Sequence, residues 1–165
     1  MPLLLLRMGG VVYDKMPDGK CFVVGYDVAT MPSNGIVTIA NTIKIDGTDC
    51  TVTGILGSED YPAYDNNGKT GDDRAAFFNC NTIKGLRFAD GSGVTWIGDH
   101  AFKSCSIKTI EKIPSTLKDI KKWCFEGSGL ESVDLSNTNV TTMEDGVGNV
   151  FITIEQPKLI RNIRV

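Results

Sequence analysis

Long apolar runs are missing from this sequence of 165 residues. The longest unbroken aliphatic run is the four leucines at positions 3–6, and no basic residue precedes them. A secretory signal needs about 7 to 15 apolar residues behind a basic segment, and a membrane-spanning helix needs about 20. The sequence therefore predicts no membrane insertion and shows no signal peptide, which leaves the localisation open.

Histidine and closely spaced cysteine pairs are also scarce. His100 is the only histidine, and no CxxC motif occurs among the five cysteines. A tetrahedral zinc site would have to draw ligands from distant parts of the chain, so we expect no metal, no cofactor, and cysteines that serve as small buried side chains. We place His100 on a solvent-facing turn before Phe102, where its replacement by alanine should cost little. No catalytic residue and no enzymatic activity are predicted.

Neither sign of charge is gathered into a long run. The 17 Lys and Arg residues against 20 Asp and Glu give a net charge of −3, without long runs of either sign. This distribution lacks the basic footprint of a nucleic-acid-binding protein. The 18 glycines separate short clusters of Ile, Val and Leu, a pattern typical of a chain that turns often and is mainly β with short helical turns.

A repeat of about 23 residues is the strongest feature of the sequence. The segment from Ile97 to Ile120 is followed by a second segment of the same pattern that ends at Met143, and a looser copy starts at Ala76. The equivalent pairs are Ala101 and Cys124, Phe102 and Phe125, Cys105 and Ser128, Ile107 and Leu130, Ile110 and Val133, Ile113 and Leu135, Leu117 and Val140, and Ile120 and Met143. Such a period predicts a solenoid in which each coil buries its apolar face against the next.

The strand of each coil predicts a continuous outer surface. In the LxxLxL stretch from Leu130 to Leu135, alternation points Val133 and Leu135 inward and the intervening residues outward. Stacked parallel strands would assemble the outward positions into one face, which is the first candidate binding surface. Its predicted residues are Gly85, Arg87, Thr109, Glu111, Ser132, Asp134 and Ser136.

These residues resemble the BspA-like leucine-rich repeats, whose units look like IGxxAFxxCxxLxxIxIPxxLxxI. The segment from Ile97 to Ile120 matches that pattern in order, with one residue missing between Cys105 and Ile107. The region from 10 to 55 is similar to the β lead-in of such domains, with a hairpin around Pro17 to Gly19 and an entry half-repeat in which Ala40 stands where proline is usual. The resemblance implies a leucine-rich-repeat solenoid with an N-terminal β-hairpin lead-in, on an exported or surface-attached protein that binds or adheres.

The organisation predicted is a single domain over 1–165. It comprises the β lead-in at 1–55, a polar loop at 56–74, three repeats at 75–143, and a C-terminal cap or partner-pairing tail at 144–165. Long polar loops often carry binding residues. The candidates in this loop are Tyr61, Tyr64, Asp65 and Arg74.

Two functions from different classes fit these features. The first is a non-enzymatic adhesion module that binds a protein or glycan on another surface. The second is a structural or decoration subunit of a larger assembly, such as a virion head fibre, since the apolar N- and C-terminal strands could join copies of the chain into a homo-oligomer. The location would be extracellular or on the cell surface in the first case and in a virion in the second.

Overall fold

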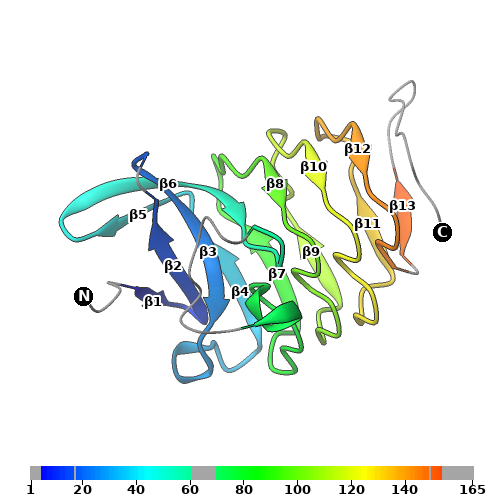
Figure 1. Cartoon of the computed structure of the whole chain (residues 1–165), viewed down its shortest axis with the longest axis horizontal. Helices are drawn as coiled ribbons and strands as arrows, with labels where there is room; N and C mark the ends of the chain where they lie inside the picture. Colours follow the sequence, from blue (N-terminus) through cyan, green and yellow to red (C-terminus); the bar gives the residue numbers. More distant parts are fainter. Residues whose placement is uncertain (1–4, 17, 61–69, 149, 154–165) are drawn as a thin grey trace.

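The fold is a short stack of β coils preceded by a β hairpin, which runs from left to right in Figure 1, a computed structural model of the chain. The structure describes residues 5–16, 18–60, 70–148 and 150–153. Thirteen strands and two short 3-10 helices, η1 (Val28–Thr30) and η2 (Gly71–Arg74), make up the regular structure of these residues. The expected class, mainly β with short helical turns, is confirmed.

The lead-in begins with three antiparallel strands. β1 (Leu6–Met8) pairs with β2 (Val11–Lys15), and β2 pairs with β3 (Lys20–Tyr26) to form the predicted hairpin. Leu6 opens a strand as expected for the N-terminal apolar segment, whereas Leu3 and Leu4 lie outside the described residues. Tyr13, at the centre of β2, is fully buried.

The entry half-repeat supplies the next three strands, β4 (Ile36–Ile39), β5 (Thr42–Ile45) and β6 (Thr48–Ile55). Ala40, which replaces the usual proline, donates its backbone N–H to the Tyr13 hydroxyl over 3.0 Å. Proline has no such donor. Alanine at position 40 therefore allows a hydrogen bond that links the half-repeat to the hairpin.

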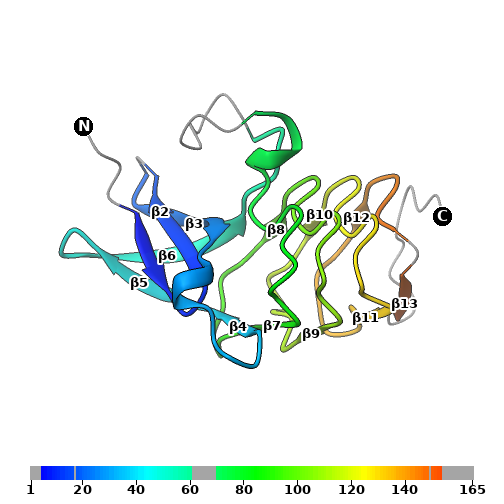
Figure 2. The ribbon, with the colours of Figure 1, turned by 90° about the horizontal axis from the view of Figure 1, so that it is seen from below.

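Two columns of parallel strands run along the solenoid. The first continues from β6 through β8 (Trp96–Ile97), β10 (Asp119–Ile120) and β12 (Thr142–Met143). The second contains β4, β7 (Gly85–Phe88), β9 (Thr109–Glu111), β11 (Ser132–Asp134) and β13 (Phe151–Thr153). Figure 2 shows the two columns on opposite sides of the coils.

The turn that links each coil to the next strand carries the aromatic spine. Phe77, Phe102 and Phe125 are buried and stack with ring centroids 5.0 and 5.6 Å apart. Backbone bonds hold the same register: the Phe77 N–H donates to the Ala101 carbonyl over 2.8 Å, and the Phe102 N–H donates to the Cys124 carbonyl over 2.8 Å. The predicted stacking of equivalent residues from coil to coil is confirmed.

The core is one continuous apolar cluster from Val11 to Val147. Val133 and Leu135 point into it as predicted, whereas Ile110 and Ile113 are half-buried. Ile113 lies beyond the end of β9 and lines a surface cavity, which explains its incomplete burial. The five cysteines are buried and unpaired as expected, and burial raises the pKa of Cys21 to about 12.

The last described strand, β13, begins with the predicted Phe151 and Ile152. Ile154 and the rest of the tail lie outside the described residues. Within the described part of the chain, no helix has the length and apolar character needed to cross a membrane.

Candidate functional site

The strand face consists of the outward side chains of β4, β7, β9, β11 and β13. Pleating turns alternate residues of each strand away from the core, and parallel pairing aligns them into two rows. Pairing places Gly85 opposite Ile36 and Thr109, and Arg87 opposite Thr38 and Glu111. On the far side, Ser132 pairs with Phe151 and Asp134 with Thr153. Adjacent β9 and β11 make the two groups of strands neighbours (Figure 1).

Most of the predicted strand-face residues are accessible. Thr109, Glu111, Ser132 and Asp134 are exposed. Arg87 is half-buried, and its Nε lies 3.8 Å from Glu111 Oε2, so a salt bridge crosses from one coil to the next. An exposed ion pair of this kind contributes little stability. A ligand could therefore replace it by binding to either side chain.

Gly85 does not present an open surface as expected. It occupies an outward position but is buried, because Thr109 and Ile36 flank it closely. A Cβ there would lie 2.9 Å from Thr109 Oγ1. The first row of the strand face is therefore closed at β7, whereas its positions on β4, β9, β11 and β13 are exposed.

Ser136 is half-buried beyond the end of β11. Its backbone N–H donates to Asp134 Oδ1 over 2.9 Å, and its hydroxyl donates to the same oxygen over 2.5 Å. These two bonds, the hydroxyl first, lower the pKa of Asp134. Ser136 thus holds Asp134 as an oriented carboxylate on the strand face, which is a supporting role that alternation alone did not indicate.

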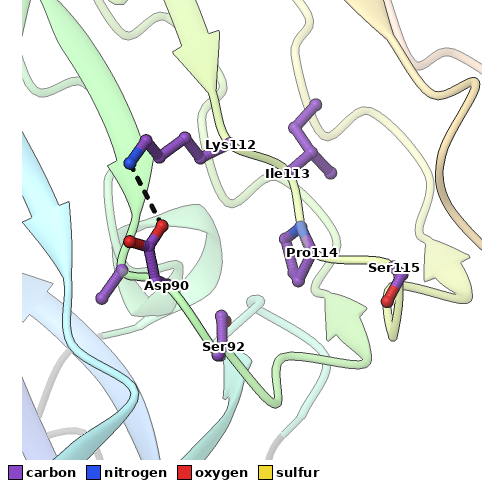
Figure 3. A pocket seen from close by; sticks show the side chains of 8 residues that line it. Asp90, Ser92, Lys112, Ile113, Pro114 and Ser115 are labelled. Carbon is purple, nitrogen blue, oxygen red and sulfur yellow. Dashed lines mark hydrogen bonds and ion pairs between the residues drawn. The ribbon is translucent and has the colours of Figure 1, made fainter.

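A cavity of about 220 Å³ lies where β7 and β9 end (Figure 3). Lys112 Nζ and Asp90 Oδ1 form an ion pair across it, 3.1 Å apart. The other side chains that line it are those of Ala89, Ser92, Ile113, Pro114 and Ser115. The cavity offers both charges, already paired, and so has no preference for a ligand of either sign.

The predicted loop site is only partly described. Tyr61, Tyr64 and Asp65 lie outside the described residues. Arg74 is half-buried at the end of η2 and engaged in contacts rather than extended into solvent. Figure 2 shows η2 beside the turns of the solenoid rather than beside the strand face. The described ends of the loop and the strand face therefore do not form one site.

His100 is buried, contrary to the expectation of a solvent-facing turn. It is 6% exposed and Asp99 is 1% exposed, because residues 57–60 pack directly on this turn. His100 Nδ1 lies 2.9 Å from Asp99 Oδ2 and 3.0 Å from Ser58 Oγ, and the Ser58 hydroxyl donates to Asp99 Oδ2. Ser58 is likewise buried.

This turn cluster, Ser58, Asp99 and His100, contains the residue types of a hydrolase triad without its geometry. In a triad the serine and the aspartate contact opposite nitrogens of the imidazole. Here both contact Nδ1, while Nε2 faces Asp72 Oδ1 at 3.6 Å. The serine hydroxyl is bonded to the aspartate and is buried. The arrangement ties the loop ends to the solenoid and has no activated nucleophile.

Electrostatics support the structural role of the turn cluster. Burial acts to raise the pKa of Asp99, but hydrogen bonds from the Ser58 hydroxyl, the Glu59 backbone N–H and His100 outweigh it and lower that pKa. Lys103 Nζ joins Asp72 to Glu126, at 3.2 and 3.3 Å. Because the pKa of Asp99 is lowered, the folded state favours the charged form of this side chain.

Sequence reasoning missed this cluster because the repeat pattern describes coils and not what covers them. One signal was present. Gly98 stands where the next coil has Lys121, and in the structure a Cβ on Gly98 would overlap the backbone of Gly57. Because glycine also stands at this position in the family pattern, this signal for close approach of another segment was not specific to the loop.

Comparisons with known proteins support one family. A model of the BspA type leucine rich repeat region matches residues 73–163, more than half of the chain, in six copies. No curated protein matches the chain significantly.

Solved structures of leucine-rich repeat proteins share the fold. One from Bacteroides capillosus is 20% identical with a TM-score of 0.68, covering 92% of this chain and 99% of its own. A leucine rich cell surface protein from Faecalibacterium prausnitzii is 15% identical with a TM-score of 0.52, and the pneumococcal vaccine antigen PcpA is 14% identical with a TM-score of 0.56. Both matches include 92% of this chain but only 42% and 38%, respectively, of these two larger proteins.

Proposed function

Because the chain belongs to the BspA-type leucine-rich repeat family, we propose that it is a non-enzymatic binding module that attaches to a protein or glycan on another surface. The binding region is the accessible part of the strand face on β9 and β11. The observation that carries the proposal is that four neighbouring polar side chains there are exposed, those of Thr109, Glu111, Ser132 and Asp134. The cell-surface description of the Faecalibacterium neighbour supports a location outside the cell.

The physical argument rests on the separation of core and surface. Inward residues such as Val133 hold the coils together, while outward residues such as Ser132 contribute nothing to that packing. Parallel stacking spaces the outward side chains by about 4.8 Å from coil to coil. A regular, rigid array of this kind binds without needing to order itself, which lowers the entropic cost of association.

The test blocks the strand face without adding charge. Ser132→Tyr places a bulky side chain on an exposed outward position of β11, and Thr48→Tyr does the same at an exposed position of β6, far from the strand face. Binding of the intact chain and both variants is measured on arrays of printed glycans and of purified extracellular-matrix proteins. We expect at least one probe to be bound by the parent chain and Thr48→Tyr and lost by Ser132→Tyr. Equal binding by all three would contradict the strand face as the site.

A structural subunit is the second candidate, and one observation favours it. Phe151, on the last described strand β13, is 83% exposed. A large apolar side chain at the end of a solenoid is a contact that stacking of another chain would cover. Light scattering of the intact chain at increasing concentration would show a defined oligomer that Phe151→Ser abolishes. A monomer at every concentration would exclude assembly through this end.

A further inference from the structure

A second cavity, of about 390 Å³, lies beside the starting ends of β7 and β9. It is open along the stack of coils, next to Thr109 of the strand face. Its side chains come from equivalent turns of consecutive coils. They are Lys84, Ser104, Cys105, Ser106, Lys108 and Ser128, with Gly127 and Gly129 adding backbone. Its size is that of a small-ligand site.

The polar side chains of this cavity are mainly hydrogen-bond donors. Lys84 and Lys108 occupy the same position of consecutive coils, directly after the inward residues Ile83 and Ile107, and both line the cavity. Lys84 Nζ donates to the Asn81 carbonyl over 3.3 Å, which leaves two of its hydrogens. Among the described residues, no carboxylate lines the cavity and none pairs with Lys108.

Hydroxyl groups supplement the two ammonium groups. The Ser104 and Ser106 side chains make no hydrogen bond to another described residue, and both line the cavity. Each hydroxyl can donate one bond and accept others. The combination of two cations, free hydroxyls and no acid is complementary to an anionic ligand that also carries hydroxyl groups.

The backbone around the cavity is already occupied. The N–H groups of Ser106, Lys108 and Gly129 donate to the carbonyls of the preceding coil over 2.9, 2.8 and 3.0 Å. An extended peptide therefore finds these three N–H groups already used and cannot add a strand through them. The one apolar side chain of the lining, Cys105, is 1% exposed and offers no anchor for a peptide side chain.

We propose that this cavity binds the anionic groups of an acidic glycan, with sulfate or carboxylate groups held by Lys84 and Lys108 and sugar hydroxyls by Ser104 and Ser106. This inference rests on the proposed binding function and specifies its ligand class. Charge limits its extent: the next coil has Glu131 at the position of Lys108, and Glu126 is paired with Lys103 at 3.3 Å. The cationic wall thus spans two coils and accommodates one or two anionic groups.

The test measures binding of the intact chain to a heparin octasaccharide by titration calorimetry. The desulfated octasaccharide and a poly-glutamate peptide are the comparison ligands. We expect the sulfated sugar to bind at least roughly tenfold more tightly than either, because charge-assisted hydrogen bonds are lost with the sulfates. The affinity should fall with added salt.

Lys108→Glu is the decisive variant, because it installs the residue that the next coil carries at this position and should leave the fold intact. Lys118→Ala, at an exposed lysine beside β10, is the matched control for loss of one positive charge, with Lys108→Ala as its partner. We expect the Lys108 variants to lose roughly tenfold or more in affinity and Lys118→Ala to bind like the parent.

Several outcomes would overturn the inference. These are no binding of the sulfated sugar, equal binding of its desulfated form, equal binding of poly-glutamate, or equal losses in Lys108→Ala and Lys118→Ala. The first three would exclude a selective site for acidic glycans, and the last would indicate diffuse attraction. Failure here, with an array signal that Ser132→Tyr abolishes, would leave the proposed function intact. A heparin signal lost in Lys108→Glu but unaffected by Ser132→Tyr would support the inference and place the ligand in this cavity beside the strand face.

Discussion

Two consecutive turns of the solenoid have the same backbone and opposite environments. His100 and Trp123 are equivalent, both have a left-handed backbone with φ of 59° and 53°, and each donates its N–H to the following coil. His100 is 6% exposed, whereas Trp123 is 38% exposed. The turn of His100 lies beneath residues 57–60, whereas these residues reach the turn of Trp123 only through the ion pairs of Asp60 with Lys121 and of Glu59 with Lys122. A repeat thus specifies the path of the chain at a position but not its burial.

The residues flanking these positions have adapted to that difference. Where the loop end packs, the chain has Gly98 and Asp99, and a hydrogen-bonded buried carboxylate results. In the next coil Lys121 and Lys122 take their places and reach over Trp96 and Trp123, with Nζ 5.5 and 5.1 Å from the ring centroids. Exposed cations over aromatic rings contribute modestly. The three predictions below test how much of the stability each turn carries.

The largest effect is expected where the two turns are alike. Phe102→Ala and Phe125→Ala each remove a buried ring from the stacked spine and should lower the free energy of unfolding by about 3 to 5 kcal/mol. Urea denaturation followed by circular dichroism measures this. An unchanged midpoint in Phe102→Ala would contradict the burial of the spine.

Gly98→Ala should separate the two turns. Its new Cβ would overlap the backbone of Gly57, so the loop end must shift, at an expected cost of about 1 to 3 kcal/mol. Lys121→Ala, at the equivalent position, introduces no overlap and removes only a partly exposed ion pair with Asp60, 3.3 Å long, so it should leave the unfolding midpoint close to that of the parent. Equal losses in both variants would show that the cover of residues 57–60 plays no part.

Asp99→Asn should have the smallest effect, about 1 kcal/mol at neutral pH, because the amide retains one oxygen but loses the charge that Ser58 and Glu59 stabilise. The pKa of Asp99 is lower in the folded state than its usual 3.8. Its contribution is therefore complete well above pH 3.8 and is lost as the pH falls through the folded pKa.

Unfolding measured from pH 7 to pH 3 should accordingly bring Asp99→Asn and the parent closer together in stability as the pH falls. Lys122→Ala is the control from the turn of Trp123. It removes a partly exposed salt bridge to Glu59, and this loss should leave stability nearly unchanged at each pH. A constant difference between parent and Asp99→Asn across this range would show that the charge of Asp99 is not what stabilises the turn.

Much of the fold could be predicted from the sequence, because the solenoid is built from local contacts that recur. The inward residues Val133 and Leu135 and the stacked Phe102 and Phe125 follow from the period alone. The exposed strand-face residues on β9 and β11 follow from alternation along each strand. Gly85 shows where that reasoning ended, since its burial depends on the size of neighbours in two other coils.

By itself, the sequence determined the coil period, the inward apolar positions and the hairpin lead-in, because each depends on residues close together in the chain or on identical packing from one coil to the next. Only the tertiary structure decided that residues 57–60 cover the turn of His100, and that Lys84 and Lys108 share one cavity with Ser104 and Ser106. Contacts made once, between an insertion and a coil or across the turns of neighbouring coils, leave no period for the sequence to display. Burial and charge complementarity at those places follow from three-dimensional proximity.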